Sequence, residues 1–171
     1  DVLNTIEAFK LMGVEIHEND ENITINGKGL NSLNKPNKEI YLGNSGTSAR
    51  LLTGLLASQK FKTVLTGDES LSSRPMKRIT DPLAQMNADI ITTDGKLPVT
   101  INGKELNPVK LDIHIPSAQI KSGVMLAALN TPGVTKITEY NISRDHTEIM
   151  LSAFDADIEI TKDGSKKIIQ I

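Results

Sequence analysis

The sequence predicts an α/β (α+β) protein in which one βαβαββ unit is written more than once. Three segments share the order of an apolar helix, a tight stop and two short strands. Gly13, Asn87 and Asp155 occupy the stop in these segments, and their residue types best tolerate the left-handed backbone that ends helices. Asp94-Gly95 and Asp163-Gly164 predict tight turns between paired strands. The stops recur about every 70 residues, which sets the size of the unit.

Apolar periodicity predicts the elements in order along the chain. Helices are expected at residues 1–12, 47–58, 75–86, 118–129 and 145–154. Strands are expected at 14–16, 23–25, 39–43, 62–66, 99–103, 111–115, 135–140 and 168–171. Asp1 is the expected N-cap of the first helix, and Pro75 suits the first position of the third. Alternation at 14–16 and 23–25 indicates strands with one buried face.

This pattern predicts a single domain over residues 1–171, divided into a partial unit at 1–30 and further units at 31–105 and 106–171. A complete first unit would need many more residues before Gly13 than stand there, and the chain does not begin with Met. We therefore expect a fragment that lacks the opening strand-helix-strand of the first unit.

Composition narrows the class of protein. The chain is 38% hydrophobic and 23% charged, which suits a folded core, but only 3% aromatic. It has no Cys, so disulfides, thiolate catalysis and Cys-based metal sites are excluded. A formal net charge of -2 argues against a general nucleic-acid binder. No apolar run is long enough to span a bilayer, so we expect a soluble, cytoplasmic protein.

The four arginines mark a candidate anion site. They are Arg50, Arg74, Arg78 and Arg144, in a chain with 19 basic residues. Each lies at or just inside the start of a predicted helix, where free N–H groups and the helix dipole attract anions. A guanidinium adds a planar fork that grips carboxylate or phosphate. The helix starts therefore predict a shared site for a polyanion.

Simpler interpretations remain beside this one. Most helix caps serve only the helix, and Asp145 and Glu148 would then complement the helix dipole. The His residues lack metal-ligand spacing, so no metal is expected. His146 is expected to be a solvated residue of a first helical turn rather than a catalyst.

Four motifs in the same regions resemble a known family. Gly43 to Arg50, which contains Asn-Ser-Gly-Thr, is similar to the Asn-Ala-Gly-Thr signature of the enolpyruvyl shikimate-phosphate synthases, and Gly67 to Met76 is similar to their second signature, which ends in Arg-Pro. Ser117 to Ser122 and Ser143 to Glu148 resemble the Ser-Ala-Gln and Arg-Asp-His-Thr-Glu blocks of the bacterial class II branch. The motifs occur in order over nearly the whole chain.

The resemblance implies two domains, each with three βαβαββ units in pseudo-threefold symmetry, of which this chain is part of one. It implies transfer of the enolpyruvyl group of phosphoenolpyruvate to the 5-hydroxyl of shikimate 3-phosphate, with release of phosphate, in aromatic amino-acid biosynthesis. No metal or organic cofactor is implied. The expected partners are these two small molecules and the second domain of the same enzyme, acting as a monomer, with no nucleic acid or membrane.

The resemblance also implies roles for individual residues. Phosphoenolpyruvate would contact Asn44, Gly46, Arg74 and Gln119. Shikimate 3-phosphate would contact Ser117, Ala118, Gln119, Ser143 and Arg144. Thr47 and Arg50 would support the first loop. Ala118 replaces a second Ser found in other branches, so one side-chain hydrogen bond is missing. Gly46 matches the position that also admits glyphosate, so an intact enzyme with this loop is expected to be glyphosate-sensitive.

The motifs present account for only part of the family's site. Its N-terminal Lys-Ser and Arg would precede Asp1, and its acidic proton-transfer group and catalytic Lys would follow Ile171. We therefore expect this chain alone to be inactive and to bind shikimate 3-phosphate weakly. Two alternatives stay open: the related UDP-N-acetylglucosamine enolpyruvyl transferase, and a non-catalytic phosphate-binding or protein-interaction domain.

Overall fold

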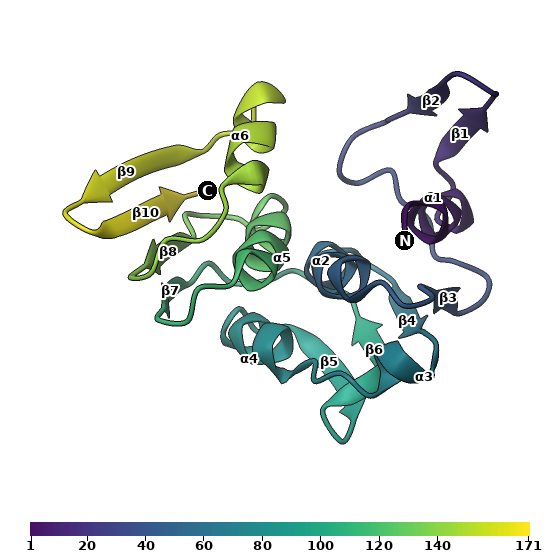
Figure 1. The fold of residues 1–171 in the computed structure, drawn as a ribbon, viewed down its shortest axis with the longest axis horizontal. Coiled ribbons are helices and arrows are strands. Elements are labelled where there is room, and N and C mark those ends of the chain that lie inside the picture. The colour runs from purple at the N-terminus through teal and green to yellow at the C-terminus, as the bar shows by residue number, and fades with distance from the viewer.

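The computed structural model describes residues 1–171 and confirms the α/β fold with a repeated βαβαββ order (Figure 1). The N-terminal part contains α1 (Val2–Leu11), β1 (Glu15–Glu18) and β2 (Ile23–Asn26). The middle part contains β3 (Ile40–Tyr41), α2 (Gly46–Ala57), β4 (Lys62–Thr66), α3 (Glu69–Ser72), α4 (Lys77–Gln85), β5 (Asp89–Thr93) and β6 (Lys96–Asn102). The last part contains β7 (Lys110–Ile113), α5 (Ala118–Ala128), β8 (Lys136–Glu139), α6 (His146–Ala153), β9 (Glu159–Asp163) and β10 (Lys166–Gln170).

The two larger sheets have the same topology. Their strand orders are β3-β4-β6-β5 and β7-β8-β10-β9. In each sheet the first two strands are parallel, because a helix crosses between them, and the remaining neighbours are antiparallel. The strands β1 and β2 form a separate antiparallel pair. The repeated order inferred from the sequence is therefore a repeated topology.

The helix stops adopt the backbone conformation that their residue types suggested. Gly13 has a φ of 86°, Asn87 of 65° and Asp155 of 55°. The Asp94-Gly95 turn has positive φ at both residues, 51° and 72°, as a two-residue hairpin loop requires. These local signals were sufficient to predict the helix stops and the turn, because each depends only on one or two residues and their own backbone.

Some local expectations were wrong. At 14–16 the expected alternation is present, since Val14 and Ile16 are partly buried and Glu15 is exposed. β2 is not half-buried: it lies in a two-stranded sheet, with Ile23 51% exposed and Ile25 60% exposed. Asp1 stands at the N-cap of α1, but its side chain makes no capping hydrogen bond. The helix expected from Pro75 begins later, with Met76 as its N-cap, since Arg74 still donates its N–H to the turn of α3 at Leu71.

Two inner helices, α2 and α5, lie side by side in the middle of the molecule (Figure 1). Their approach depends on small residues, since a Cβ placed on Gly54 would lie 1.9 Å from the carbonyl oxygen of Gly123. Around them, 27 buried apolar residues form one continuous core. The packing brings the starts of both helices together, which is the feature that builds the site.

Candidate anion-binding site

The start of α2 is organised by its N-cap. The Ser45 hydroxyl accepts the N–H of Ser48 at 3.2 Å, which satisfies one of the free N–H groups at the helix start. Thr47 is exposed and Gly46 is buried beneath two arginines. The family-like motif is therefore a capped helix start.

Arg50 links three segments that are far apart in sequence. Its Nη1 donates to the carbonyl oxygen of Gly46 at 3.2 Å and to Oε1 of Gln119 at 2.9 Å. Its Nη2 donates to the carbonyl oxygen of Pro75 at 3.2 Å. Gln119 completes the link, because its Nε2 donates to the Thr47 hydroxyl at 2.9 Å. The start of α2 is thereby joined to the start of α5 and to the segment before α4.

Arg74 lies on the other side of the same helix start. Its Nη2 donates to Oδ1 of Asn44 and to the Ser70 hydroxyl. A Cβ added to Gly46 would lie 2.9 Å from Nη1 of Arg50 and 3.1 Å from Nη1 of Arg74. Only a residue without a side chain lets both guanidinium groups come this close to the backbone.

The electrostatics of this place favour an anion. The pKa of Arg50 is lowered, first by burial and then by the positive charges of Arg74 and Arg78. Gathered like charges raise each other's energy, and a bound phosphate or carboxylate would relieve that repulsion. The helix starts add partial positive charge at the same place.

A cavity of about 270 Å³ opens beside this charged group, between the starts of α2, α5 and α6. Its lining includes four residues singled out in the sequence: Thr47, Ala118, Gln119 and Arg144. It also includes residues that were not singled out as ligands: Leu51, Ser122, His146 and Thr147. Gln119 belongs both to the cavity and to the Arg50 link, so it connects the two halves of the site.

Two candidate ligand residues are engaged within the chain instead. The Ser117 hydroxyl caps α5 by accepting the N–H of Ile120 at 3.5 Å. The Ser143 hydroxyl donates to Oε1 of Glu139 at 2.6 Å. Neither residue lines the cavity. Their assignment to shikimate 3-phosphate stays a prediction, as do the other residue assignments.

Sequence reasoning missed a buried charged group beside the cavity. Lys121, Glu139, Glu148 and Lys167 are almost completely buried and form ion pairs with one another. Glu148 was expected only to complement a helix dipole. The available signal was Lys121 in the middle of the otherwise apolar run of α5, together with charged residues on the buried faces of β8 and β10.

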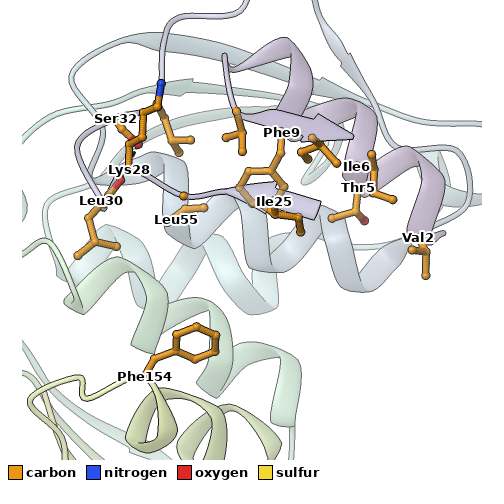
Figure 2. A pocket seen from close by; sticks show the side chains of 15 residues that line it. Val2, Thr5, Ile6, Phe9, Ile25, Lys28, Leu30, Ser32, Leu55 and Phe154 are labelled. Carbon is orange, nitrogen blue, oxygen red and sulfur yellow. Dashed lines mark hydrogen bonds between the residues drawn. The ribbon is translucent and has the colours of Figure 1, made fainter. Parts of the chain in front are cut away.

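A larger hollow lies elsewhere and has a different chemistry. It measures about 670 Å³ and is lined mostly by apolar side chains. Figure 2 shows Ile6 and Phe9 of α1 with Ile25 and Leu55 on one side, and Phe154 on the other. Lys28 is the only charged residue in its lining. This surface does not suit a phosphorylated ligand.

No three His, Asp or Glu side chains come together as ligands for a metal ion. None of the helices combines the length and the hydropathy that crossing a bilayer requires.

Comparison with known proteins gives a consistent answer. The sequence model of the EPSP synthase (3-phosphoshikimate 1-carboxyvinyltransferase) family matches residues 1–171. A 3-phosphoshikimate 1-carboxyvinyltransferase of Citrifermentans bemidjiense is 49% identical over 97% of this chain and 39% of its own length. The enzyme of that name from Magnetococcus marinus is 50% identical over 99% of this chain and 38% of its own length. EPSP synthase of Acinetobacter baumannii has a similar structure, with a TM-score of 0.90 and 46% identity over 98% of this chain and 38% of that one. The chain thus spans less than two-fifths of the length of these relatives.

Proposed function

Because this chain belongs to the EPSP synthase family, we propose that it forms part of an enzyme that transfers the enolpyruvyl group of phosphoenolpyruvate to the 5-hydroxyl of shikimate 3-phosphate. Phosphate is released, and the product leads towards chorismate and the aromatic amino acids. The full enzyme is a transferase whose partners are two phosphorylated small molecules and the remaining part of the same protein. Both substrates carry charges that prevent free passage through membranes, so we place the enzyme in the cytoplasm.

One observation carries the proposal: the Arg50–Gln119–Thr47 link, which joins an arginine-rich helix start to the cavity that Arg144 lines. Two adjacent anions need two adjacent positive regions with a neutral polar group between them. Gln119 occupies that middle position and offers both an acceptor and a donor. We propose that phosphoenolpyruvate lies at Asn44, Gly46 and Arg74, with Gln119 at its border.

Shikimate 3-phosphate then occupies the cavity at the starts of α5 and α6. Arg144 holds its phosphate with a guanidinium fork, and Ala118 and Gln119 line the space for its ring. Ser117 and Ser143 shape the two helix starts. The Ser117 hydroxyl accepts its capping bond and can still donate to the ligand, whereas the Ser143 hydroxyl would have to exchange its bond to Glu139. Thr47 and Arg50 hold the loop between the ligands.

The chain positions anions but offers little acid–base chemistry. No carboxylate lines the cavity, and His146 is the only imidazole in its lining. Addition and loss of phosphate require groups within hydrogen-bond reach of the reacting atoms. We propose that those groups come from the part of the enzyme outside these residues.

Thermal unfolding of the chain with added ligand tests the proposal. At one hundred times its Kd, a ligand that binds only the native state stabilises it by about 2.7 kcal/mol. Shikimate 3-phosphate should raise Tm by several degrees, and UDP-N-acetylglucosamine should not. Arg144→Ala should abolish the shift, while Lys104→Ala, whose side chain contacts Asn87 away from the cavity, should retain it. Stabilisation by UDP-N-acetylglucosamine alone would point to the related transferase, and no response to either ligand would count against the proposed site.

A further inference from the structure

Four charged side chains meet inside the protein, each from a different element. Nζ of Lys121 in α5 lies 3.1 Å from Oε2 of Glu139 in β8 and 2.6 Å from Oε1 of Glu148 in α6. Nζ of Lys167 in β10 lies 3.1 Å and 2.7 Å from the same two oxygens. We call Lys121, Glu139, Glu148 and Lys167 the buried charge cluster. Two positive and two negative groups balance within it.

The hydrogen bonds of the cluster favour the charged forms of Glu139 and Lys167. Burial alone would favour neutral Glu139, but hydrogen bonds from Ser143 and Lys121 outweigh burial and lower its pKa. Burial likewise opposes the charged form of Lys167, but hydrogen bonds to Glu148 and Glu139 outweigh it and raise its pKa. The cluster therefore keeps full charges out of water, which is costly unless they are well paired.

The second unit, residues 31–105, fills the equivalent position in its interior without charged side chains. The equivalent positions follow from the shared topology. The helix residues are matched by their distance from the N-caps Ser45 and Ser117 or from the stops Asn87 and Asp155. The strand residues are matched by their pairing, which is Leu65↔Val99 in the second unit and Glu139↔Lys167 in the third. These positions are Ala49, Leu65, Thr80 and Val99.

Stability does not explain the charges. Ala49, Leu65 and Val99 are fully buried and apolar, so the fold can be built with apolar side chains at this position. A buried ion pair is often no more stabilising than apolar side chains of similar size. In addition, Oε2 of Glu148 is buried and has no hydrogen-bond partner, which is a cost to the folded state. A different advantage is needed to explain why the third unit carries the cluster.

That advantage lies in the loop between β8 and α6. Nζ of Lys121 donates to the carbonyl oxygen of Arg144 at 2.8 Å. Oε1 of Glu139 accepts the N–H of Ser143 at 3.2 Å and its hydroxyl at 2.6 Å. Three hydrogen bonds thus run from the cluster to consecutive residues of the loop. Charged groups make these bonds stronger than neutral ones would be.

We propose that the buried charge cluster is a positioning device that holds the Ser143–Arg144 loop in the shape in which Arg144 lines the anion cavity. Lys121 and Glu139 are its positioning residues, since they touch the loop and do not need to touch the ligand. Lys167 and Glu148 keep those two ionised and in place. The inference rests on the proposed function for the identity of the ligand, a phosphorylated small molecule, but not for the order of the loop.

A matched pair of variants separates positioning from stability. Lys121→Met and Lys167→Met each remove one positive charge from the same two carboxylates, but only Lys121 contacts the loop. We expect similar losses in Tm for both. Exchange of the Ser143 amide hydrogen, which Glu139 accepts, should accelerate at least about tenfold more in Lys121→Met, because the loop loses the charge-assisted hydrogen bond to the carbonyl oxygen of Arg144. The affinity for shikimate 3-phosphate should fall about tenfold in Lys121→Met and much less in Lys167→Met.

The outcomes are decisive in either direction. Equal exchange and equal affinity in the two variants would overturn the inference, as would faster loop exchange with unchanged affinity in Lys121→Met. If the original chain itself does not respond to shikimate 3-phosphate, the proposed function fails, and the exchange rates alone still decide whether the cluster orders the loop.

A fourfold replacement keeps the inference testable if the single variants do not fold. Lys121→Ala, Glu139→Leu, Glu148→Thr and Lys167→Val together install the side chains of the second unit. We expect this variant to fold with a Tm near that of the original chain and with fast exchange of the Ser143 amide hydrogen. Unchanged protection of that amide would show that the loop is ordered without the cluster.

Discussion

Gly46 shows how a single residue decides the shape of the arginine-rich helix start. It lies under the guanidinium groups of both Arg50 and Arg74. Arg50 in turn reaches Gln119 and the backbone before α4. A change at Gly46 therefore acts on the positions of both cations without removing either charge.

Gly46→Ala should weaken the binding of phosphoenolpyruvate more than it affects folding. The new Cβ would come within 2.9 Å of one guanidinium and 3.1 Å of the other. Both are ends of flexible side chains, so they would shift and lose alignment at a cost below about 1 kcal/mol in stability. Calorimetric titration with phosphoenolpyruvate checks the affinity. Gly27→Ala is the matched control, since a Cβ at Gly27 would meet nothing within 4 Å, and an equal effect of both changes would contradict the expectation.

At the scale of elements, the contact between α2 and α5 places the cavity. Gly54 and Gly123 allow the two helices to approach until backbone meets backbone. The caps Ser45 and Ser117 then hold both helix starts on the same side. The buried charge cluster ties α5 and α6 to β8 and β10, so the third helix start joins them.

Gly54→Ala should destabilise the chain strongly. Its Cβ would lie 1.9 Å from the carbonyl oxygen of Gly123, and a backbone atom cannot move aside as a side chain can. Overpacking of this kind costs about 1–3 kcal/mol or more, which exceeds the gain of about 1 kcal/mol from replacing Gly in a helix. Urea unfolding monitored by circular dichroism measures the change. Gly46→Ala, in the same helix, is the control, and a neutral Gly54→Ala would mean that the helices lie farther apart.

The buried charge cluster should also give stability a particular pH dependence. The pKa of Glu139 is lowered from 4.5, so its contribution is present above that pH and is lost as pH falls through the folded value. The pKa of Lys167 is raised from 10.5, so its contribution is present below that pH and is lost as pH rises through the folded value. The difference in Tm between the original chain and the fourfold replacement should be constant in between. A difference that changes steadily near neutral pH would contradict this.

At the scale of the whole molecule, the repeated topology gathers helix starts at one cavity and leaves an apolar hollow of about 670 Å³ elsewhere (Figure 2). The anion site is assembled from α2, α5 and α6, together with the segment before α4. Its residues are proposed to bind and orient a ligand, and the chain spans less than two-fifths of the length of its relatives. Binding and catalysis should therefore be separable in this chain.

We expect no enolpyruvyl transfer from the 171-residue chain, even where shikimate 3-phosphate binds. Without an acid–base group at the reacting atoms, positioning alone leaves the proton transfers uncatalysed. Phosphate release from shikimate 3-phosphate and phosphoenolpyruvate together should equal the rate without protein. Release above that background, lost in Arg144→Ala, would show that the chain contains a complete site.

The sequence by itself determined the repeated unit, its helix stops and the family-like motifs. Those features depend on short-range chemistry: a left-handed residue at Asn87 or Asp155, a capping Ser before an apolar helix, alternation along a strand. The helix starts that hold Thr47, Gln119 and Arg144 could be predicted for the same reason. That these helix starts meet at one cavity was predicted only in general terms, as a shared site for a polyanion.

The tertiary structure alone decided which polar groups line the cavity and which make hydrogen bonds within the protein. Ser117 and Ser143 make such bonds, at the cap of α5 and to Glu139, and their role as ligand residues stays a prediction. Glu148 resembles a first-turn surface acid but is buried among lysines. The half-burial expected of β2 was wrong, because alternation cannot say whether anything covers a strand. The physical reason is common to all: burial and pairing depend on partners far away in the chain, which only the packed fold brings into contact.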